Sequence, residues 1–185
     1  YSFSAGYFKD KFEKIGVAHS YRNFDIDEIE ELQDVIANNK NLKGLNVTIP
    51  YKKLVIPFLH HASTVVKKIN ACNCIRKYNN ELYGYNTDVI GFEKSLAPFL
   101  QPHHTHALIL GTGGAAVAVE WVLQKLNINY LLVSRTNANA NSWESGNAIS
   151  YEALTTELLN QYTLIINTSP VGMYPNEDEL PSLPY

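Results

Sequence analysis

The stretch ALILGTGGAA, residues 107–116, decides the fold of this chain. Its apolar first part, Ala107–Leu110, predicts a buried strand, and the glycine cluster that follows opens a helix running to about Leu126. A strand, a glycine-rich turn and a helix in this order fit the dinucleotide-binding fingerprint, with Ala116 in its third small position. A merely tight turn between strand and helix is the alternative, and the surrounding pattern favours cofactor binding.

The small residues of this loop each have a physical reason to be there. Gly111 permits the tight turn, Gly113 lets the backbone approach a pyrophosphate, and Ala116 lets the helix pack closely on the strand. The helix N-terminus adds N–H donors and a partial positive charge for phosphates. The predicted cofactor-binding residues of the loop are Gly111, Thr112, Gly113, Gly114 and Ala115.

The chain beyond the loop continues the alternation of strands and helices. We predict a strand at Tyr130–Ser134, a polar loop at Asn137–Asn147, a helix near Tyr151–Leu159 and a strand at Thr163–Asn167. This βαβαβ order is one mononucleotide-binding half of a doubly wound α/β sheet of the Rossmann type. The tail Tyr174–Tyr185 is rich in proline and acidic residues and predicts a loop.

The strand after the first helix of this half ends at Ser134-Arg135-Thr136. NAD sites usually carry Asp or Glu at this place, where the carboxylate accepts hydrogen bonds from ribose hydroxyls. Arg135 stands here instead, and its planar fork of donors suits the 2′-phosphate of NADP. We therefore predict NADP(H) rather than NAD(H) as the cofactor. The alternative is an arginine that is simply exposed at a strand end.

The first half of the chain predicts a second α/β domain. The expected helices are residues 3–15, the stretch behind Asp25 with the apolar positions Ile26, Ile29, Leu32, Val35 and Ile36, the short segment Tyr51–Leu59, and the stretch from Val89 to about Leu100. Asp25 and Glu28 have the spacing of a capping box. The expected strands are Ala18–Phe24, a buried strand Leu42–Ile49, and a hairpin of Ala71–Tyr78 with Glu81–Tyr85 around Asn79-Asn80. The polar stretch Gln101–His106 separates the two domains, 1–101 and 102–185.

Polar residues at the ends of these elements invite two interpretations. Asn46 to Lys52 ends a predicted strand, Asn73 lies within another, and Asn86-Thr87-Asp88 opens a helix. Taken singly, Asn86 or Thr87 fits an ordinary helix cap, Lys52 a surface charge and Asn73 a strand-edge residue. Taken together, they match the motifs of a known family.

The chain resembles the shikimate 5-dehydrogenases over essentially its whole length. The motifs that carry the resemblance are Tyr1-Ser2-Phe3-Ser4, Asn46-Val47-Thr48-Ile49-Pro50-Tyr51-Lys52, Asn70-Ala71-Cys72-Asn73, Gly84 to Phe92, Gly111 to Ala115, Ser134-Arg135-Thr136 and Asn167 to Met173. The patterns Asn-Val-Thr-x-Pro-x-Lys and Asn-Thr-Asp-x-x-Gly are specific to this group. The resemblance further implies that the chain lacks parts of the family's sequence at both ends.

The resemblance implies an activity and a role for each motif. Members of this family reduce 3-dehydroshikimate to shikimate with NADPH, on the pathway to aromatic amino acids. The first half would bind substrate and the second half cofactor. The implied substrate-binding residues are Ser2, Ser4, Thr48, Lys52, Asn73 and Asp88, the implied catalytic pair is Lys52 with Asp88, and Thr168 joins the cofactor-binding residues Gly111, Thr112, Gly113, Gly114, Ala115, Ser134, Arg135 and Thr136.

Departures from the family's pattern keep two alternatives open. Ala5 stands where most members have proline, Cys74 where threonine is common, and Asn139 near the place of a second arginine for the 2′-phosphate. Relaxed use of NAD as well as NADP, with quinate as a second substrate, is one alternative. A metabolite-binding homologue without catalysis is the other, and the presence of both Lys52 and Asp88 argues against it.

Composition excludes several other classes of protein. Among 185 residues, 45% are hydrophobic and 18% are charged, which is the composition of a globular protein. A net charge of -3 gives no basic surplus for nucleic acid or an anionic membrane. We expect a cytoplasmic monomer or homodimer that acts on a small molecule. No metal site is expected, because His103, His104 and His106 share one short proline-containing stretch.

Overall fold

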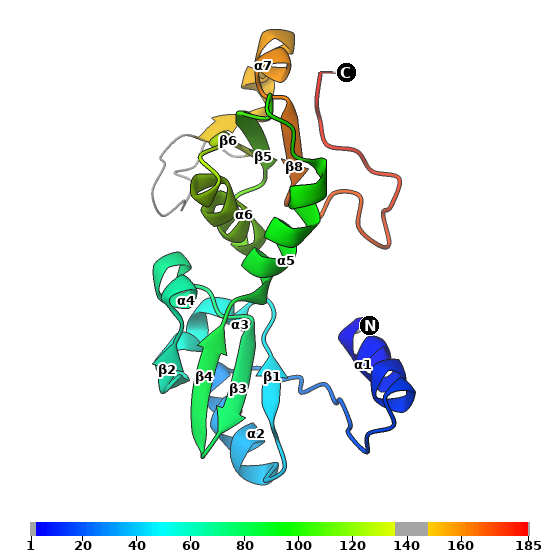
Figure 1. The fold of residues 1–185 in the computed structure, drawn as a ribbon, viewed down its shortest axis with the longest axis vertical. Helices are drawn as coiled ribbons and strands as arrows, with labels where there is room; N and C mark the ends of the chain where they lie inside the picture. Colours follow the sequence, from blue (N-terminus) through cyan, green and yellow to red (C-terminus); the bar gives the residue numbers. More distant parts are fainter. Residues whose placement is uncertain (1–2, 136–147, 185) are drawn as a thin grey trace. The chain divides into compact units, whose positions relative to one another are not determined.

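The computed structural model describes residues 3–135 and 148–184 of the chain (Figure 1). The chain forms two compact units, Tyr1–Leu42 and Lys43–Tyr185. Within the described ranges, none of the helices combines the length and hydropathy that a membrane span needs.

The regular secondary structure described in the unit Tyr1–Leu42 is helical. Its elements are α1 (Phe3–Lys14), the short 3₁₀ turn η1 (Ile29–Glu31) and α2 (Leu32–Asn38). Aromatic rings of α1 pack on the chain that follows the helix: Phe8 stacks on Tyr21 with ring centres 5.2 Å apart. The helix predicted over residues 3–15 is therefore confirmed, as is the helix that ends before Asn39.

Two predictions for this unit are wrong. Residues 18–24 form no strand, because neither described sheet gives this segment a partner strand, and a strand needs one to satisfy its backbone. The second helical segment begins at Ile29 instead of directly behind Asp25. Its start is set by the Glu31 carboxylate, which accepts hydrogen bonds from the backbone N–H groups of Asp27 (2.8 Å) and Glu28 (2.9 Å).

The second unit opens with a four-stranded sheet whose order is β1-β3-β4-β2. The strands are β1 (Gly44–Asn46), β2 (His61–Ala62), β3 (Cys74–Tyr78) and β4 (Glu81–Tyr85), and all pairings are antiparallel except that of β2 with β4. The predicted hairpin of β3 and β4 is confirmed, with positive φ at Asn79 (49°) and Asn80 (60°), as a tight type I′ turn requires.

The helices around this sheet are short, and one strand differs from its prediction. They are α3 (Tyr51–Leu54), η2 (Ile56–Phe58), α4 (Thr64–Ile69), α5 (Thr87–Leu96) and η3 (Ala97–Phe99). The predicted helices at 51–59 and 89–100 are thus confirmed, each with a break that ends the α-helical part. The strand predicted as buried over Leu42–Ile49 is a short edge strand, β1, with exposed residues at both of its ends.

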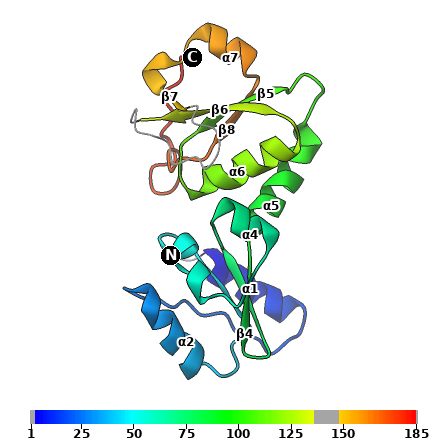
Figure 2. The ribbon, with the colours of Figure 1, turned by 90° about the vertical axis from the view of Figure 1, so that its left-hand side faces the viewer.

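A second sheet, fully parallel, follows in the same unit. Its elements are β5 (His106–Leu110), α6 (Gly114–Lys125), β6 (Asn129–Ser134), β7 (Ala148–Ser150), η4 (Tyr151–Ala153), α7 (Thr156–Gln161) and β8 (Leu164–Asn167). The strand order β7-β6-β5-β8 reverses direction at β5, which is the mark of a doubly wound α/β sheet (Figure 2). The predicted α/β class is confirmed, whereas β7 was missed, and the predicted loop at 137–147 lies outside the described residues.

Burial explains why β5 forms the centre of this sheet. Ala107, Leu108 and Ile109 are fully buried, because both faces of the strand are covered. One face packs against α6, while Leu108 and Leu110 on the other face pack against Leu154 and its neighbours. The division of the chain at residues 101 and 102 stays a prediction; the two sheets fall on opposite sides of that point.

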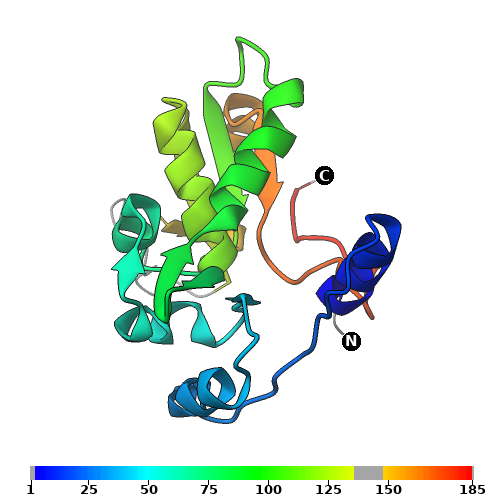
Figure 3. The same ribbon diagram turned by 60° about the horizontal axis from the view of Figure 1, so that its bottom comes forward.

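Helices α5 and α6 lie side by side in this unit (Figure 3). Val89 of α5 and Ile69 of α4 belong to one buried apolar cluster with Val117, Ala118 and Val122 of α6. This packing holds the start of α5, where Asp88 lies, against the helix that the glycine loop opens.

Candidate active site

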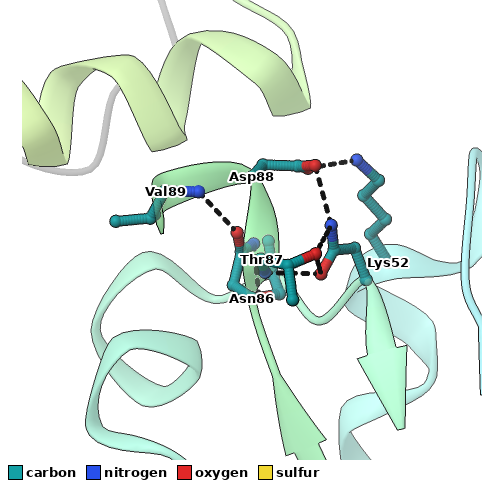
Figure 4. Close-up of polar contacts among 7 residues, drawn as sticks. Lys52, Asn86, Thr87, Asp88 and Val89 are labelled. Atoms are coloured by element: carbon teal, nitrogen blue, oxygen red, sulfur yellow. Dashed lines mark hydrogen bonds and ion pairs between the residues drawn. The ribbon is translucent and has the colours of Figure 1, made fainter. Parts of the chain in front are cut away.

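Lys52 and Asp88 form a close ion pair between two helices. Lys52 lies in α3 and Asp88 in the first turn of α5, and their atoms Nζ and Oδ2 are 2.7 Å apart although 36 residues separate them in the chain (Figure 4). Their side chains keep 22% and 39% of their surface exposed. A charged pair that is partly buried, and still open to solvent, can contact a polar ligand.

The end of the first sheet positions Lys52 next to Asn73. The carbonyl of Lys52 accepts a hydrogen bond of 2.7 Å from the Cys72 N–H, which ties α3 to this segment. Asn73 itself bridges two neighbours: its N–H donates to Tyr85 (3.1 Å), and its carbonyl accepts from Val47 (2.9 Å). Asn73 thus occupies a fixed place beside β3, and its side chain lies where it can reach the start of α5.

The Asn73 amide completes the surroundings of Asp88. Its Nδ2 group donates to Asp88 Oδ1 at 2.7 Å and to Thr87 Oγ1 at 3.0 Å. Its Oδ1 atom accepts from the Thr87 N–H at 2.8 Å. The two oxygens of Asp88 are therefore shared between Asn73 and Lys52, which fixes the carboxylate from two sides.

Asn86 caps the helix that carries Asp88. Its Oδ1 atom accepts from the Val89 N–H at 3.2 Å, and its Nδ2 group donates to the Ala71 carbonyl at 3.1 Å. The residue is only 4% exposed, so both contacts are made in the interior. The predicted cap is confirmed, and it also ties the segment that carries Asn73 to the helix that carries Asp88 (Figure 4).

The predicted substrate-binding residues fall in both units of the chain. Lys52, Asn73 and Asp88 share hydrogen bonds. Thr48 is exposed just before α3, where its carbonyl accepts a bond of 2.8 Å from the Tyr51 N–H. Ser4 lies in α1 of the first unit, and Ser2 lies outside the described residues.

Thr87 is a member of this network that the sequence did not single out. Both its N–H and its hydroxyl contact the Asn73 amide, although the sequence suggested only a helix cap. The available signal was its place directly beside Asp88 in the Asn-Thr-Asp motif.

The glycine loop follows β5 at the point where the strand order reverses. Gly111 has φ +111°, and a Cβ atom there would lie 2.9 Å from Thr168 Oγ1. Thr168, directly after β8, is held close because both its N–H and its hydroxyl donate to the Leu110 carbonyl at 2.9 Å. The predicted need for glycine at this turn is confirmed by both its conformation and its neighbours.

Contacts within the protein do not require glycine at the next two glycine positions. Gly113 and Gly114 are exposed at the start of α6, and a Cβ atom at either would meet nothing within 4 Å. Ala116, in contrast, is fully buried against the sheet. A bare backbone at a helix N-terminus, where N–H groups lack intrahelical acceptors, fits the pyrophosphate of a dinucleotide. Exposed Ala115 and partly buried Thr112 complete this loop.

The end of β6 carries the predicted contact for a 2′-phosphate. Ser134 is buried, whereas Arg135 is exposed directly after it. Burial raises the pKa of the Tyr151 phenol, and the positive charge of Arg135 partly opposes that rise. Thr136 and Asn139 lie outside the described residues.

The cysteines and histidines show no sign of separate chemistry. Cys72 and Cys74 are free, and burial raises the pKa of both thiols, which lowers their reactivity at neutral pH. In the part of the chain that the structure describes, no three His, Cys, Asp or Glu side chains are grouped to hold a metal ion.

Comparisons with known proteins place these features in a family context. The family model described as the shikimate dehydrogenase substrate binding domain matches residues 1–75. The protein named shikimate dehydrogenase (NADP(+)) of Methanosphaera stadtmanae is 33% identical over 195 residues, covering 99% of this chain and 69% of that protein. The protein of the same name from Methanococcus maripaludis strain C6 is 34% identical, covering 100% of this chain and 69% of its own length.

Solved structures agree. The shikimate dehydrogenase of Aquifex aeolicus matches with a TM-score of 0.83 at 31% identity, covering 100% of this chain and 70% of that one. The enzyme of Thermus thermophilus, solved with NADP(H) and shikimate, matches with a TM-score of 0.81 at 27% identity, covering 99% of this chain and 69% of that one.

Proposed function

The chain belongs to the shikimate dehydrogenase family, and we propose that Lys52 and Asp88 are the catalytic pair of an NADPH-dependent reduction of 3-dehydroshikimate to shikimate. Membership makes the protein an NADP-dependent oxidoreductase of aromatic amino-acid (chorismate) biosynthesis. The observation that carries the proposed roles is the 2.7 Å contact of Lys52 Nζ with an Asp88 carboxylate that Asn73 also holds.

The proposed chemistry needs a proton donor at a carbonyl oxygen. NADPH, when bound, supplies the hydride that adds to the carbonyl carbon. Negative charge then develops on the carbonyl oxygen, and an ammonium group directed at that oxygen stabilises the charge and donates a proton. Lys52 has three N–H donors, and within residues 3–135 and 148–184 Asp88 accepts from one of them, which leaves donors for a substrate oxygen. The Asp88 carboxylate orients Lys52 and offsets its positive charge.

The substrate and cofactor residues follow the family's motifs. We assign the ring hydroxyls of the substrate to Thr48, Lys52, Asn73 and Asp88, and its carboxylate to Ser2 and Ser4. The cofactor would be held by Gly111, Thr112, Gly113, Gly114, Ala115, Ser134, Arg135, Thr136 and Thr168. The exposed backbone of Gly113 and Gly114 supports the phosphate part of this assignment. A substrate domain over 1–101 and a cofactor domain over 102–185 complete the proposal.

The cellular location, oligomeric state and partners of the protein are also proposed. We infer a cytoplasmic enzyme, monomeric or homodimeric, that acts on a small molecule and does not bind nucleic acid. The net charge of -3 supports the last point, because nucleic-acid binding depends largely on basic side chains.

The assay that tests this function is NADPH oxidation by the complete protein with 3-dehydroshikimate. Loss of NADPH absorbance that depends on both reactants is the expected result. Faster oxidation of quinate with NAD than of shikimate with NADP would favour the relaxed quinate/shikimate alternative. Binding of shikimate without any turnover would reject catalysis and favour the metabolite-binding homologue.

Arg135→Ala is expected to weaken the preference for NADPH over NADH by about tenfold or more, the effect of losing a charge-assisted hydrogen bond. The ratio of kcat/KM for the two cofactors measures it. Arg76→Ala is the matched control, since Arg76 is also exposed but lies in β3 of the other sheet. An unchanged ratio in the Arg135 variant would contradict the assigned contact.

A further inference from the structure

Thr87 lies beside the proposed catalytic pair. Among the described residues, it makes no hydrogen bond to Lys52 or to the side chain of Asp88. Its contacts go to Asn73: its N–H donates to Asn73 Oδ1 at 2.8 Å, and its hydroxyl lies 3.0 Å from Asn73 Nδ2. We propose that Thr87 is a positioning residue that fixes the Asn73 amide with its NH2 group toward Asp88. This inference rests on the proposed function of the Lys52–Asp88 pair.

The orientation of the amide decides whether Asp88 is held or repelled. The two ends of an asparagine amide have nearly the same shape, so packing hardly distinguishes them. With its NH2 group toward Asp88, Asn73 donates a bond of 2.7 Å to the carboxylate. Turned by half a rotation, the amide would place its oxygen at the same short distance from a negatively charged oxygen, which is repulsive.

The Thr87 N–H selects one of the two orientations of the Asn73 amide, because an N–H group can donate a hydrogen bond but cannot accept one. An N–H group 2.8 Å away accepts no hydrogen bond, so it selects the oxygen end of the amide. The hydroxyl of Thr87 can donate or accept and therefore fits either end. The backbone N–H, rather than the side chain, is thus the part of Thr87 that sets the orientation.

The helix start makes this N–H available. Thr87 is the first residue of α5, and the first N–H groups of a helix have no intrahelical acceptor. Asn86 caps the Val89 N–H and leaves that of Thr87 for Asn73. The three consecutive residues Asn86, Thr87 and Asp88 thereby supply the cap, the orienting donor and the carboxylate.

Proline at position 87 suits the helix start but removes the N–H, and its ring Cδ, which takes the place of the amide hydrogen, also pushes away the Asn73 oxygen that lies 2.8 Å from this nitrogen. Proline is favoured at the first helical position. Asn86 already has the extended conformation, φ -121° and ψ 109°, that a residue before proline prefers. Thr87→Val is the matched reference, because it removes the hydroxyl and keeps the N–H, and Thr87→Ser keeps both.

The expected result is a graded loss of kcat for 3-dehydroshikimate reduction in the complete protein. Thr87→Ser should stay within about twofold of the wild type, and Thr87→Val should lose about two- to threefold, as expected for a redundant hydrogen bond. Thr87→Pro should lose a further factor of about ten, with KM changed by no more than about twofold. Equal kcat in the Pro and Val variants would overturn the proposal.

A double-mutant cycle separates positioning from a general structural effect. If Thr87 acts through Asn73, Thr87→Pro should cost almost nothing more in an Asn73→Ala background. An undiminished loss in that background would overturn the proposal. Thermal midpoints check folding. Should the Pro variant not fold, Asn73→Asp replaces it, because this variant keeps an oxygen for the Thr87 N–H but turns a second oxygen, instead of an NH2 group, toward Asp88. Its kcat should fall below that of Asn73→Ala, and an equal or higher kcat would overturn the proposal. Full activity of Lys52→Ala would instead reject the proposed catalytic role of the Lys52–Asp88 pair, on which this inference rests.

Discussion

Replacing Lys52 with alanine is expected to lower kcat by at least about 100-fold, the low end of what general acid catalysis contributes, with only a modest change in KM. The ammonium that contacts the Asp88 carboxylate is the proposed proton donor, and its loss would leave the developing charge on the substrate oxygen without a partner. Steady-state rates of 3-dehydroshikimate reduction by the complete protein, at saturating NADPH, measure the effect.

The neighbouring lysine provides the control for this prediction. Lys53 lies in the same short helix but is exposed, so Lys53→Ala changes the charge of α3 equally without touching Asp88. It should keep kcat within about twofold, as surface substitutions usually do. If Lys52→Ala kept its kcat and raised only KM, Lys52 would be a binding residue and another group would supply the proton.

The sequence predicts the members of this site better than their mutual arrangement. Motif resemblance named Lys52, Asn73 and Asp88, and the fold brings them together across a sheet end and a helix start. The role of Thr87 escaped prediction because it depends on which way one amide is turned, and no residue pattern encodes that. Asn86 was predicted as a cap, but its second bond, to Ala71, joins segments that only the folded chain places side by side.

The same difference between local and long-range information explains which strands and turns the sequence predicts correctly and which it does not. The glycine loop and β5 are strong local patterns, and both were predicted correctly. β7 was missed because a strand of three residues gives too short a pattern to detect. The segment 18–24 has strand-like residues, but strand formation depends on a partner that the local pattern cannot supply. β1 was predicted as buried because its apolar residues resemble those of a central strand, although it lies at an edge.

Two alanine substitutions in the glycine loop are expected to impair different properties: one the stability of the fold, the other the affinity for NADPH. Gly111→Ala should destabilise the fold by about 2–5 kcal/mol, because it combines an unfavourable positive φ with overpacking. The added methyl would lie 2.9 Å from Thr168 Oγ1 and 3.2 Å from the Ser169 nitrogen. Thermal or denaturant unfolding measures this loss.

Gly113→Ala should leave the fold unchanged but weaken NADPH binding by about tenfold or more. The added methyl group would keep the backbone away from the pyrophosphate, and a charge-assisted hydrogen bond would be lost. A Cβ atom at position 113 would meet nothing within 4 Å in the protein. The same is true of exposed Gly91 in α5, so Gly91→Ala is the matched control. Titration with NADPH measures the affinity. Unchanged affinity in Gly113→Ala would mean that the loop is only a tight turn, since of its glycines 111, 113 and 114 the fold requires Gly111. Weaker binding at unchanged stability would mean that the second glycine serves a ligand, because the protein itself leaves that space open.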